Sequence, residues 1–289
     1  MKQTVTFPSK ISEIWNRLPV LIKAILSGFL VSTLGVAIWT ADFNFLPFFL
    51  SIFIMIILLW VYWKYFSGSW GSKASVESRR SRFRSVELSA KVWKWGLIGG
   101  LLFVVIVQSS FIITFRVVDI PAKYSSGYPI IETLPPWLGW VLVIMSSVVA
   151  GICEETGFRG YMQVPLEKRY GPAIGITVVS VVFTIIHLNK IWAAPIIPNI
   201  FFASVLLGLL ANQSGSLIPG IIGHSILDIF DYSFWWTNLV SRTVHPTIFK
   251  TGPDQHFIIW VLVFATSTST FFWVINRLSG ARRGIVLKN

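Results

Sequence analysis

The residues of this sequence best suited to chemistry are two adjacent carboxylates, two imidazoles and one further carboxylate: Glu154, Glu155, His187, His224 and Asp228. All five lie in otherwise apolar stretches. At the centre of a membrane helix an ionised side chain costs roughly 2.5 to 3.5 kcal/mol, so such residues usually face a cavity and mark function. A base, two imidazoles and a carboxylate around a water molecule fit hydrolysis, in which one group activates the water and others stabilise an oxyanion.

The spacing around the paired carboxylates predicts divided roles. Glu155 and Arg159 are four residues apart and share one helical face, so they can form an ion pair. Glu154 points about 100° away. We expect the arginine to hold Glu155 ionised, and Glu154, removed from water beside another negative charge, to act as a general base. The alternative interpretation is a charge cluster at a helix end that reaches toward the membrane interface.

The other three residues leave more than one interpretation open. His224 and Asp228 are four apart, so the carboxylate can orient the imidazole, or both can meet a common water or metal. His187 alone equally fits a packed, hydrogen-bonded residue. Glu154, His187, His224 and Asp228 offer the nitrogen and oxygen atoms that zinc binds. Because no HExxH motif is present and no spacing demands a metal, a zinc site and a metal-free site both stay open.

Membrane helices must position these side chains. The chain has 289 residues, of which 54% are hydrophobic and 12% charged, a combination typical of membrane proteins. A span needs about 20 predominantly apolar residues. The sequence therefore predicts an all-α, polytopic membrane helix bundle of about eight transmembrane helices. Their ranges are 19–41, 44–66, 95–115, 137–162, 172–189, 194–212, 215–231 and 256–276.

The predicted spans place the candidate residues at different depths. Counting about 1.5 Å per residue, Glu154 lies some 12 Å from a helix end near Met162, whereas His187 lies about 22 Å from Pro172. The groups can meet only if the fifth helix begins deeper on that side or the helices tilt. Cys153, the single cysteine, has no base four residues away and is assigned to packing.

The net charge of +12 arises from basic residues that gather in alternate connections, which indicates membrane topology and not nucleic-acid binding. Both termini are then predicted to be cytoplasmic. A basic, Ser-rich stretch at 67–89 divides an N-terminal two-helix region, 1–92, from a six-helix region, 93–289. The cluster from Arg79 to Arg84 is interpreted as a topology determinant, with a patch for anionic lipid or an acidic partner as the alternative.

The three polar segments resemble the motifs of the CPBP family, the CAAX-protease and bacteriocin-processing group also called abortive-infection proteins. Its motifs EExxxR, FxxxH and HxxxN or HxxxD stand here in that order, over about residues 135–232. They are Glu154-Glu155 to Arg159, Phe183 to His187, and His224 to Asp228. The resemblance implies that Glu154 activates water with His187, that Glu155 is a supporting carboxylate paired with Arg159, and that His224 with Asp228 polarises the scissile carbonyl.

The resemblance implies an intramembrane endopeptidase of the CAAX prenyl protease 2 type, either a glutamate protease or a metalloprotease. Its substrates would be membrane-associated or lipidated peptides, and its location the plasma membrane of a bacterium. Asp228 stands where the prenyl-processing branch usually has Asn. An ionised Asp accepts hydrogen bonds but cannot donate to an oxyanion, which favours orientation of His224 or metal ligation. The alternatives are a non-enzymatic immunity or scaffold protein of the same fold, and a proton-coupled transporter, for which internal repeats are expected but not seen.

Overall fold

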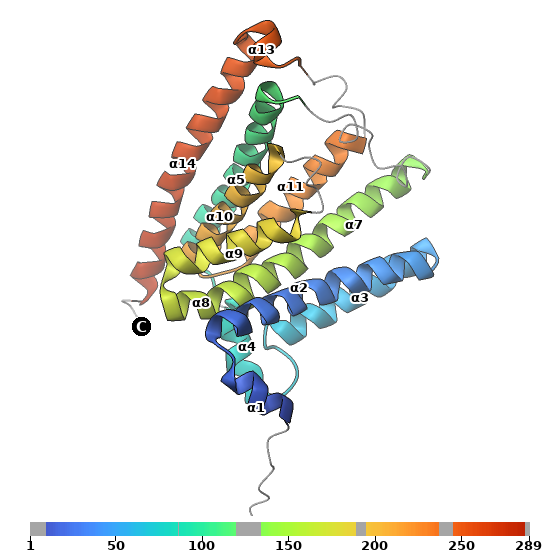
Figure 1. Cartoon of the computed structure of the whole chain (residues 1–289). Coiled ribbons are helices and arrows are strands. Elements are labelled where there is room, and N and C mark those ends of the chain that lie inside the picture. Colours follow the sequence, from blue (N-terminus) through green and yellow to red (C-terminus); the bar gives the residue numbers. More distant parts are fainter. Residues whose placement is uncertain (1–9, 86, 120–133, 189–194, 237–244, 287–289) are drawn as a thin grey trace, which may run out of the picture.

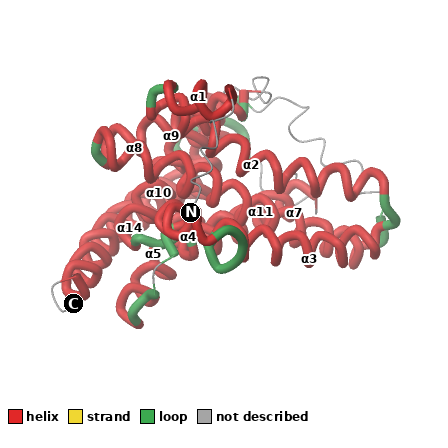
Figure 2. Tube along the Cα trace, turned by 90° about the horizontal axis from the view of Figure 1, so that it is seen from below, coloured by secondary structure: helices red, strands yellow, loops and turns green. Residues whose placement is uncertain are grey.

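A computed structural model describes residues 10–85, 87–119, 134–188, 195–236 and 245–286. Every regular element in these ranges is a helix, and none is a strand (Figure 2). The predicted polytopic helical bundle is thereby confirmed. The eight predicted spans correspond to α2 (Val20–Phe45), α3 (Phe48–Phe66), α5 (Ala90–Val117), α7 (Pro136–Glu154) with its continuation, α9 (Pro172–Ile186), α10 (Ile197–Ser214), α11 (Ile218–Trp236) and α14 (Gln255–Val286).

Six of these helices are long and apolar enough to cross a membrane, counted over the described residues. The two others are α9, a shorter apolar helix of 15 residues, and α11, which carries Asp228 and Asp231. The number eight therefore stays a prediction. Short helices outside the spans are α1 (Lys10–Arg17), η1 (Lys73–Ser75), α4 (Val76–Phe83) and α13 (Ile248–Thr251). Residues 120–133 and 190–193, which fall between predicted spans, lie outside the described residues.

The helix of the fourth predicted span is longer than its predicted range, 137–162. It runs on from α7 through a π-helical segment, η3 (Glu155–Met162), into α8 (Gln163–Tyr170). Glu154 therefore lies 16 residues before the end of the helix, roughly 24 Å. His187, 15 residues after Pro172, lies at a similar distance from the same end. The predicted mismatch in depth disappears because the polar sequence after Met162 continues the helix instead of forming a loop.

Prolines mark the starts of α7 and α9. Pro136 and Pro172 each occupy the first turn of a helix, where a missing N–H costs nothing. Gly171 precedes Pro172 with φ of +87°, a conformation that a residue without a Cβ adopts readily. A single glycine therefore reverses the chain between α8 and α9. As a result, α9 runs back into the bundle and ends at His187.

The bundle has two sides joined by the helices that carry the motifs (Figure 1). On one side α14 packs along α5, and on the other α2 and α3 form a hairpin that packs through α2 on α7 and η3. Between them, α11 contacts both α5 and α7, and α10 contacts α9 and α5. Gly157 of η3 lets α2 approach closely, because a Cβ there would lie 2.5 Å from the carbonyl oxygen of Gly28 and 2.5 Å from the Cβ of Ser32.

The division of the chain at residue 92 into two regions stays a prediction. Contacts cross this boundary, because α2 packs on η3 and the connection after α4 contacts α8. Arg84 forms an ion pair with Glu167 at 2.7 Å. Arg79 is buried and donates hydrogen bonds to the backbone carbonyls of Tyr65, Trp70 and Ser72. The expected basic cluster is therefore not a uniform surface patch, because two of its arginines hold neighbouring segments of the chain together.

Candidate active site

Glu155 lies at the centre of the candidate site and is fully buried. Its Oε1 lies 3.0 Å from Nη1 of Arg159, which is also fully buried, so the structure contains the ion pair that the spacing predicts. The guanidinium lies over the ring of Phe183 at 4.6 Å and donates through Nη2 to the hydroxyl of Ser204 at 3.1 Å. Arg159 thereby joins η3 to α9 and α10, two helices whose residues line one cavity.

The imidazole of His224 connects the first motif to the third. Its Nδ1 lies 2.9 Å from the same Oε1 of Glu155. Its Nε2 lies 3.9 Å from Oε2 of Glu154 and 3.8 Å from Oδ2 of Asp228. The ring is thus surrounded by three carboxylates, of which one holds it by a hydrogen bond. Orientation of this ring by Asp228 is one of the interpretations that the spacing leaves open, and Glu155 makes the shorter contact with the ring.

His187 and His224 face one cavity. The cavity has a volume of about 110 Å³, and its polar lining residues are His187, Ser204, His224, Asp228 and Asp231. His187 ends α9, where its Nδ1 lies 2.7 Å from the carbonyl oxygen of Phe183. The Phe183 ring contacts both imidazoles, with centroid distances of 4.5 Å and 6.4 Å. The structure therefore brings the second and third motifs together. Glu154 of the first motif lies next to Nε2 of His224.

A small residue on α11 makes room for Glu155. A Cβ at Gly220 would lie 3.1 Å from its Oε2, tighter than an ordinary contact. This Oε2 is buried without a hydrogen-bond partner among the described residues, so both contacts of the carboxylate converge on Oε1. Such an arrangement fixes the carboxylate against α11, and with it the imidazole of His224.

The expected zinc ligands are only partly assembled. Nε2 of His224, Glu154 and Asp228 lie near one another, and His187 lines the same cavity. Within the described ranges no group of three or more His, Cys, Asp or Glu side chains is placed to hold a metal ion. The arrangement therefore gives no support to a complete zinc site, and the chain's own residues are considered without a metal.

Two residues that line this cavity were not predicted from the sequence. Asp231 follows His224 by seven residues and Asp228 by three, so the same helical face that predicts the third motif also contains this residue. Ser204, the partner of Arg159, had no such signal, because a serine in an apolar helix is common. Asn199 of α10 donates to Thr114 of α5 at 2.9 Å and joins these two helices.

The bundle and its site define an integral membrane protein whose ionisable residues gather around a cavity between the helices. Residues 135–230 match the family model described as Type II CAAX prenyl endopeptidase Rce1-like, which confirms the resemblance to the CPBP family in that segment. The segment contains all three motifs, and the match indicates a CAAX-type intramembrane endopeptidase, a hydrolase. No curated protein and no solved structure matches the chain.

Proposed function

We propose that this protein hydrolyses a peptide bond of a membrane-associated or lipidated substrate with a water molecule activated by Glu154 and His187. The observation that carries the proposal is the position of His224. Its Nδ1 is held by Glu155, while its Nε2 is next to Glu154 and Asp228 at a cavity shared with His187. A base and a hydrogen-bond donor beside one reacting bond are the minimum that peptide hydrolysis needs.

In the first step Glu154 takes a proton from water, and the oxygen of that water attacks the carbonyl carbon of the scissile bond. His187, which lines the cavity, orients the water. The carbonyl oxygen becomes an oxyanion, which accepts a hydrogen bond from Nε2 of His224. Glu154 then returns its proton to the leaving nitrogen as the C–N bond breaks, so the carboxylate is regenerated with the two products.

The buried ion pair has a positioning role in this scheme. A histidine that donates from both ring nitrogens carries a positive charge, and the three carboxylates around His224 compensate it. Glu155 fixes the ring through Nδ1, so that Nε2 points at the reacting group. Arg159 in turn balances the charge of Glu155. We assign Asp228 to the same task, since it accepts hydrogen bonds and cannot stabilise an oxyanion itself.

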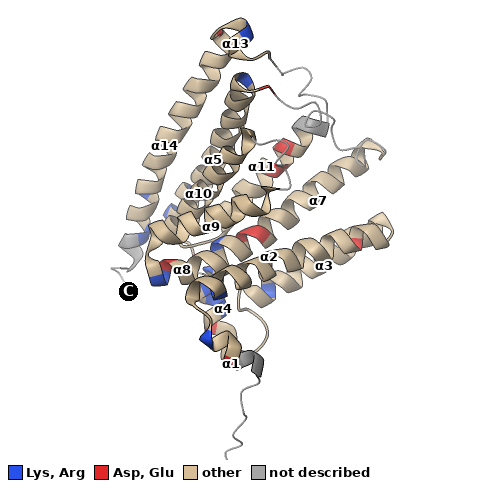
Figure 3. Ribbon diagram, viewed as in Figure 1, with Lys and Arg blue, Asp and Glu red and all other residues tan. Residues whose placement is uncertain are grey.

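The substrate and the setting belong to the same proposal. We infer that the protein lies in the plasma membrane of a bacterium with both termini in the cytoplasm, because its basic residues gather at one end of the bundle, around α1, α4, α8 and the end of α14 (Figure 3). A zinc ion held by Glu154, His187, His224 and Asp228 stays a prediction, which metal analysis of the purified protein tests. An immunity or scaffold role and proton-coupled transport are the alternatives.

Substitution of the base tests the proposed function. Glu154→Gln keeps the shape of the side chain but removes the proton acceptor, so we expect cleavage of a membrane-bound peptide substrate by the purified protein to fall about 10² to 10⁴-fold. Cys153→Ala is the matched control on the neighbouring position, and it should cleave like the unaltered protein because its thiol is buried in packing. Full activity of Glu154→Gln, with both variants folded, contradicts the proposed role.

A further inference from the structure

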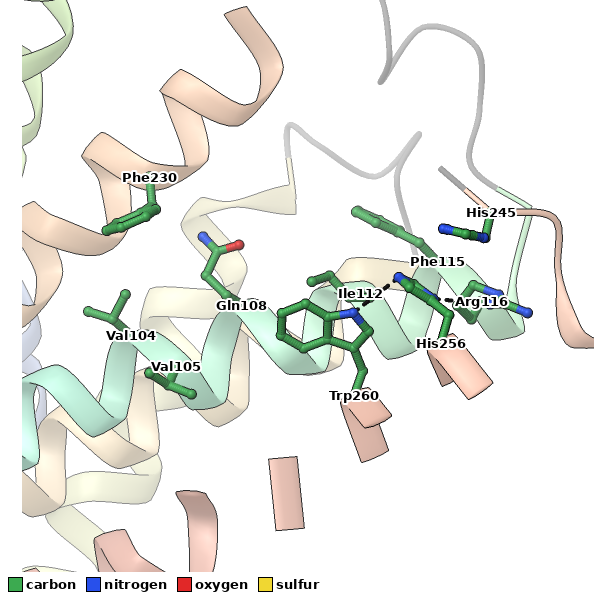
Figure 4. Close-up of a pocket in the computed structure, with 10 residues that line it drawn as sticks. All are labelled: Val104, Val105, Gln108, Ile112, Phe115, Arg116, Phe230, His245, His256 and Trp260. Atoms are coloured by element: carbon green, nitrogen blue, oxygen red, sulfur yellow. Dashed lines mark hydrogen bonds between the residues drawn. The ribbon is translucent and has the colours of Figure 1, made fainter. Parts of the chain in front are cut away.

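A second, larger cavity lies outside the candidate active site. It has a volume of about 370 Å³, in the range of small-molecule sites. Side chains of α5 line it in a row from Val104 to Arg116, with Phe230 of α11 and Trp260 of α14 on the other walls (Figure 4). Apart from Gln108, the polar residues of the lining gather at the Arg116 end. The cavity therefore has a long apolar part and one polar end.

The polar end contains more hydrogen-bond donors than acceptors. Arg116 is 2% exposed and donates to both carboxylate oxygens of Asp254 at 2.9 Å and to Thr251 at 3.1 Å. Its Nε is buried and has no partner among the described residues. The amide nitrogen of Gln108, further along the cavity, is likewise buried and unpartnered there. Two buried N–H donors thus line a cavity without a protein acceptor, which costs free energy unless something else accepts from them.

His256 adds a third unmet donor. Its Nδ1 lies 3.1 Å from Nη1 of Arg116, and its Nε2 accepts from the indole N–H of Trp260 at 3.1 Å. Arginine and tryptophan can only donate, whereas a neutral imidazole has one acceptor nitrogen. In one of the two contacts, therefore, an N–H group of His256 faces another N–H donor. His245 stacks on this ring with a centroid distance of 3.9 Å and brings further ring nitrogens to the same place.

The dimensions of the cavity agree with half a bilayer. Twelve residues separate Val104 from Arg116, about 18 Å along the helix, and half of a hydrocarbon core is about 15 Å. The cavity also reaches the apolar surface of the bundle, because Val105 is 41% and Phe230 is 59% exposed. A chain that enters from the membrane can therefore lie along α5, with its polar group at the level where α5 ends.

We propose that this cavity binds one membrane phospholipid, with an acyl chain along α5 and the phosphate against Arg116 and His256. The phosphate offers the acceptor oxygens that the polar end lacks, and the apolar wall replaces the surrounding lipid chains. The lipid belongs to the leaflet away from the basic end of the bundle. The site is separate from the catalytic cavity, which lies against Phe103, Val107 and Phe111 of the same helix.

Native mass spectrometry of the purified, delipidated protein tests this site without reference to catalysis. After each lipid is added in turn, we expect one dioleoyl phosphatidylethanolamine to stay bound per chain. Dioleoylglycerol, which has the same acyl chains but no phosphate, should stay bound about tenfold less. Equal retention of the two lipids overturns the proposed role of Arg116 and His256. Displacement of the phospholipid by inorganic phosphate alone overturns the role of the acyl chain.

A filling variant locates the bound lipid. Val105→Trp places an indole in the cavity from an exposed position, so the fold should tolerate it while phospholipid retention falls about tenfold. Leu34→Trp is the matched control, since Leu34 is 44% exposed and lines another apolar cavity, of about 200 Å³, between α2 and α3. Equal losses in the two variants, or no loss in either, overturn the assignment. The comparison of the two lipids uses the unaltered protein and remains decisive even if a variant fails to fold.

Discussion

A single carboxylate oxygen organises the candidate site at the scale of residues. Oε1 of Glu155 lies 3.0 Å from Arg159 and 2.9 Å from His224, two groups that belong to different motifs. All three side chains are less than a tenth exposed. At positions buried from water to this degree, an unpaired charge costs several kcal/mol. The stability of the bundle should therefore depend on the balance of these charges more than on any one of them.

Removal of one charge should be worse than removal of two. Arg159→Met removes one buried positive charge from beside Glu155, and we expect a loss of about 3 to 5 kcal/mol in the free energy of unfolding. The double variant Glu155→Gln/Arg159→Met buries no unpaired charge at these two positions, and should be more stable than Arg159→Met alone. Thermal unfolding in detergent, followed by tryptophan fluorescence, measures both.

Glu155→Gln alone serves as the second side of this double-mutant cycle. If the two single changes and the double change add up within about 0.5 kcal/mol, the pair is not coupled, and the argument from buried charge is wrong.

The sequence predicts the local contacts of these residues better than the distant ones. The pair Glu155–Arg159 follows from a spacing of four residues. The contact between Glu155 and His224 joins positions 69 residues apart, and no helical periodicity connects them. The assignment of His224 to Asp228 was a reasonable inference from spacing alone. The structure gives the closer contact to Glu155 because α11 packs on the helix that carries it.

The π-helical segment is the decisive feature at the scale of elements. In η3 the backbone is wound more widely than in an α-helix, and such segments often occur at functional sites. It begins at Glu155, directly after Glu154. This change in winding could not be predicted, since the residues of η3 themselves suit an ordinary helix. The early end predicted for the span has a different origin, because polar residues after Met162 are typical of a loop but here continue the helix as α8.

Glycine at position 157 should be required for the contact between η3 and α2. We expect Gly157→Ala to destabilise the protein by about 1 to 3 kcal/mol, because its Cβ would overlap Gly28 and Ser32. Gly280→Ala in α14 is the matched control. It has no heavy atom within 4 Å of the added Cβ, and should stabilise the protein by about 0.5 to 1 kcal/mol.

Opposite signs for the two alanine variants, read from their unfolding midpoints in the same detergent, are the expected result. A neutral Gly157→Ala would show that α2 can withdraw from η3 at little cost.

The arrangement of charge is the main feature at the scale of the whole molecule. Basic side chains collect at the end of the bundle formed by α4, α8 and the last turns of α14, while the end at α13 carries few (Figure 3). This polarity agrees with the orientation deduced from the sequence. In the proposed orientation, the turn between α8 and α9 lies on the cytoplasmic side and α13 on the opposite side.

Cysteine labelling of intact cells tests this orientation. Cys153→Ala removes the single natural cysteine, and Phe249→Cys then places a thiol on α13, where the side chain is 80% exposed. A membrane-impermeant maleimide should label this variant and should leave Ser78→Cys in α4 unlabelled until the cells are opened. The reverse pattern would invert the proposed topology.

Much of the whole-molecule architecture could be predicted because hydropathy is a strong signal over 20 residues. The all-helical fold and the places of all eight predicted spans agree with the helices observed. The two helices that do not meet the criteria for a complete span are α9 and α11. In α11 the polar residues His224, Asp228 and Asp231 weaken the hydropathy signal, whereas α9 is apolar but has only 15 residues. The mutual packing of these helices depends on side-chain shape, which a hydropathy pattern does not contain.

The shortness of α9 connects the site to the thickness of the membrane. Its 15 residues extend about 22 Å, less than the roughly 30 Å of a hydrocarbon core. Hydrophobic mismatch of this kind is relieved by local thinning of the bilayer or by polar groups that cover the gap. His187 stands at the end of the short helix, beside the catalytic cavity. A thin bilayer would therefore bring water close to this imidazole, whereas a thick one would cover it with hydrocarbon, so the lipid composition of the membrane itself would regulate hydration of the site.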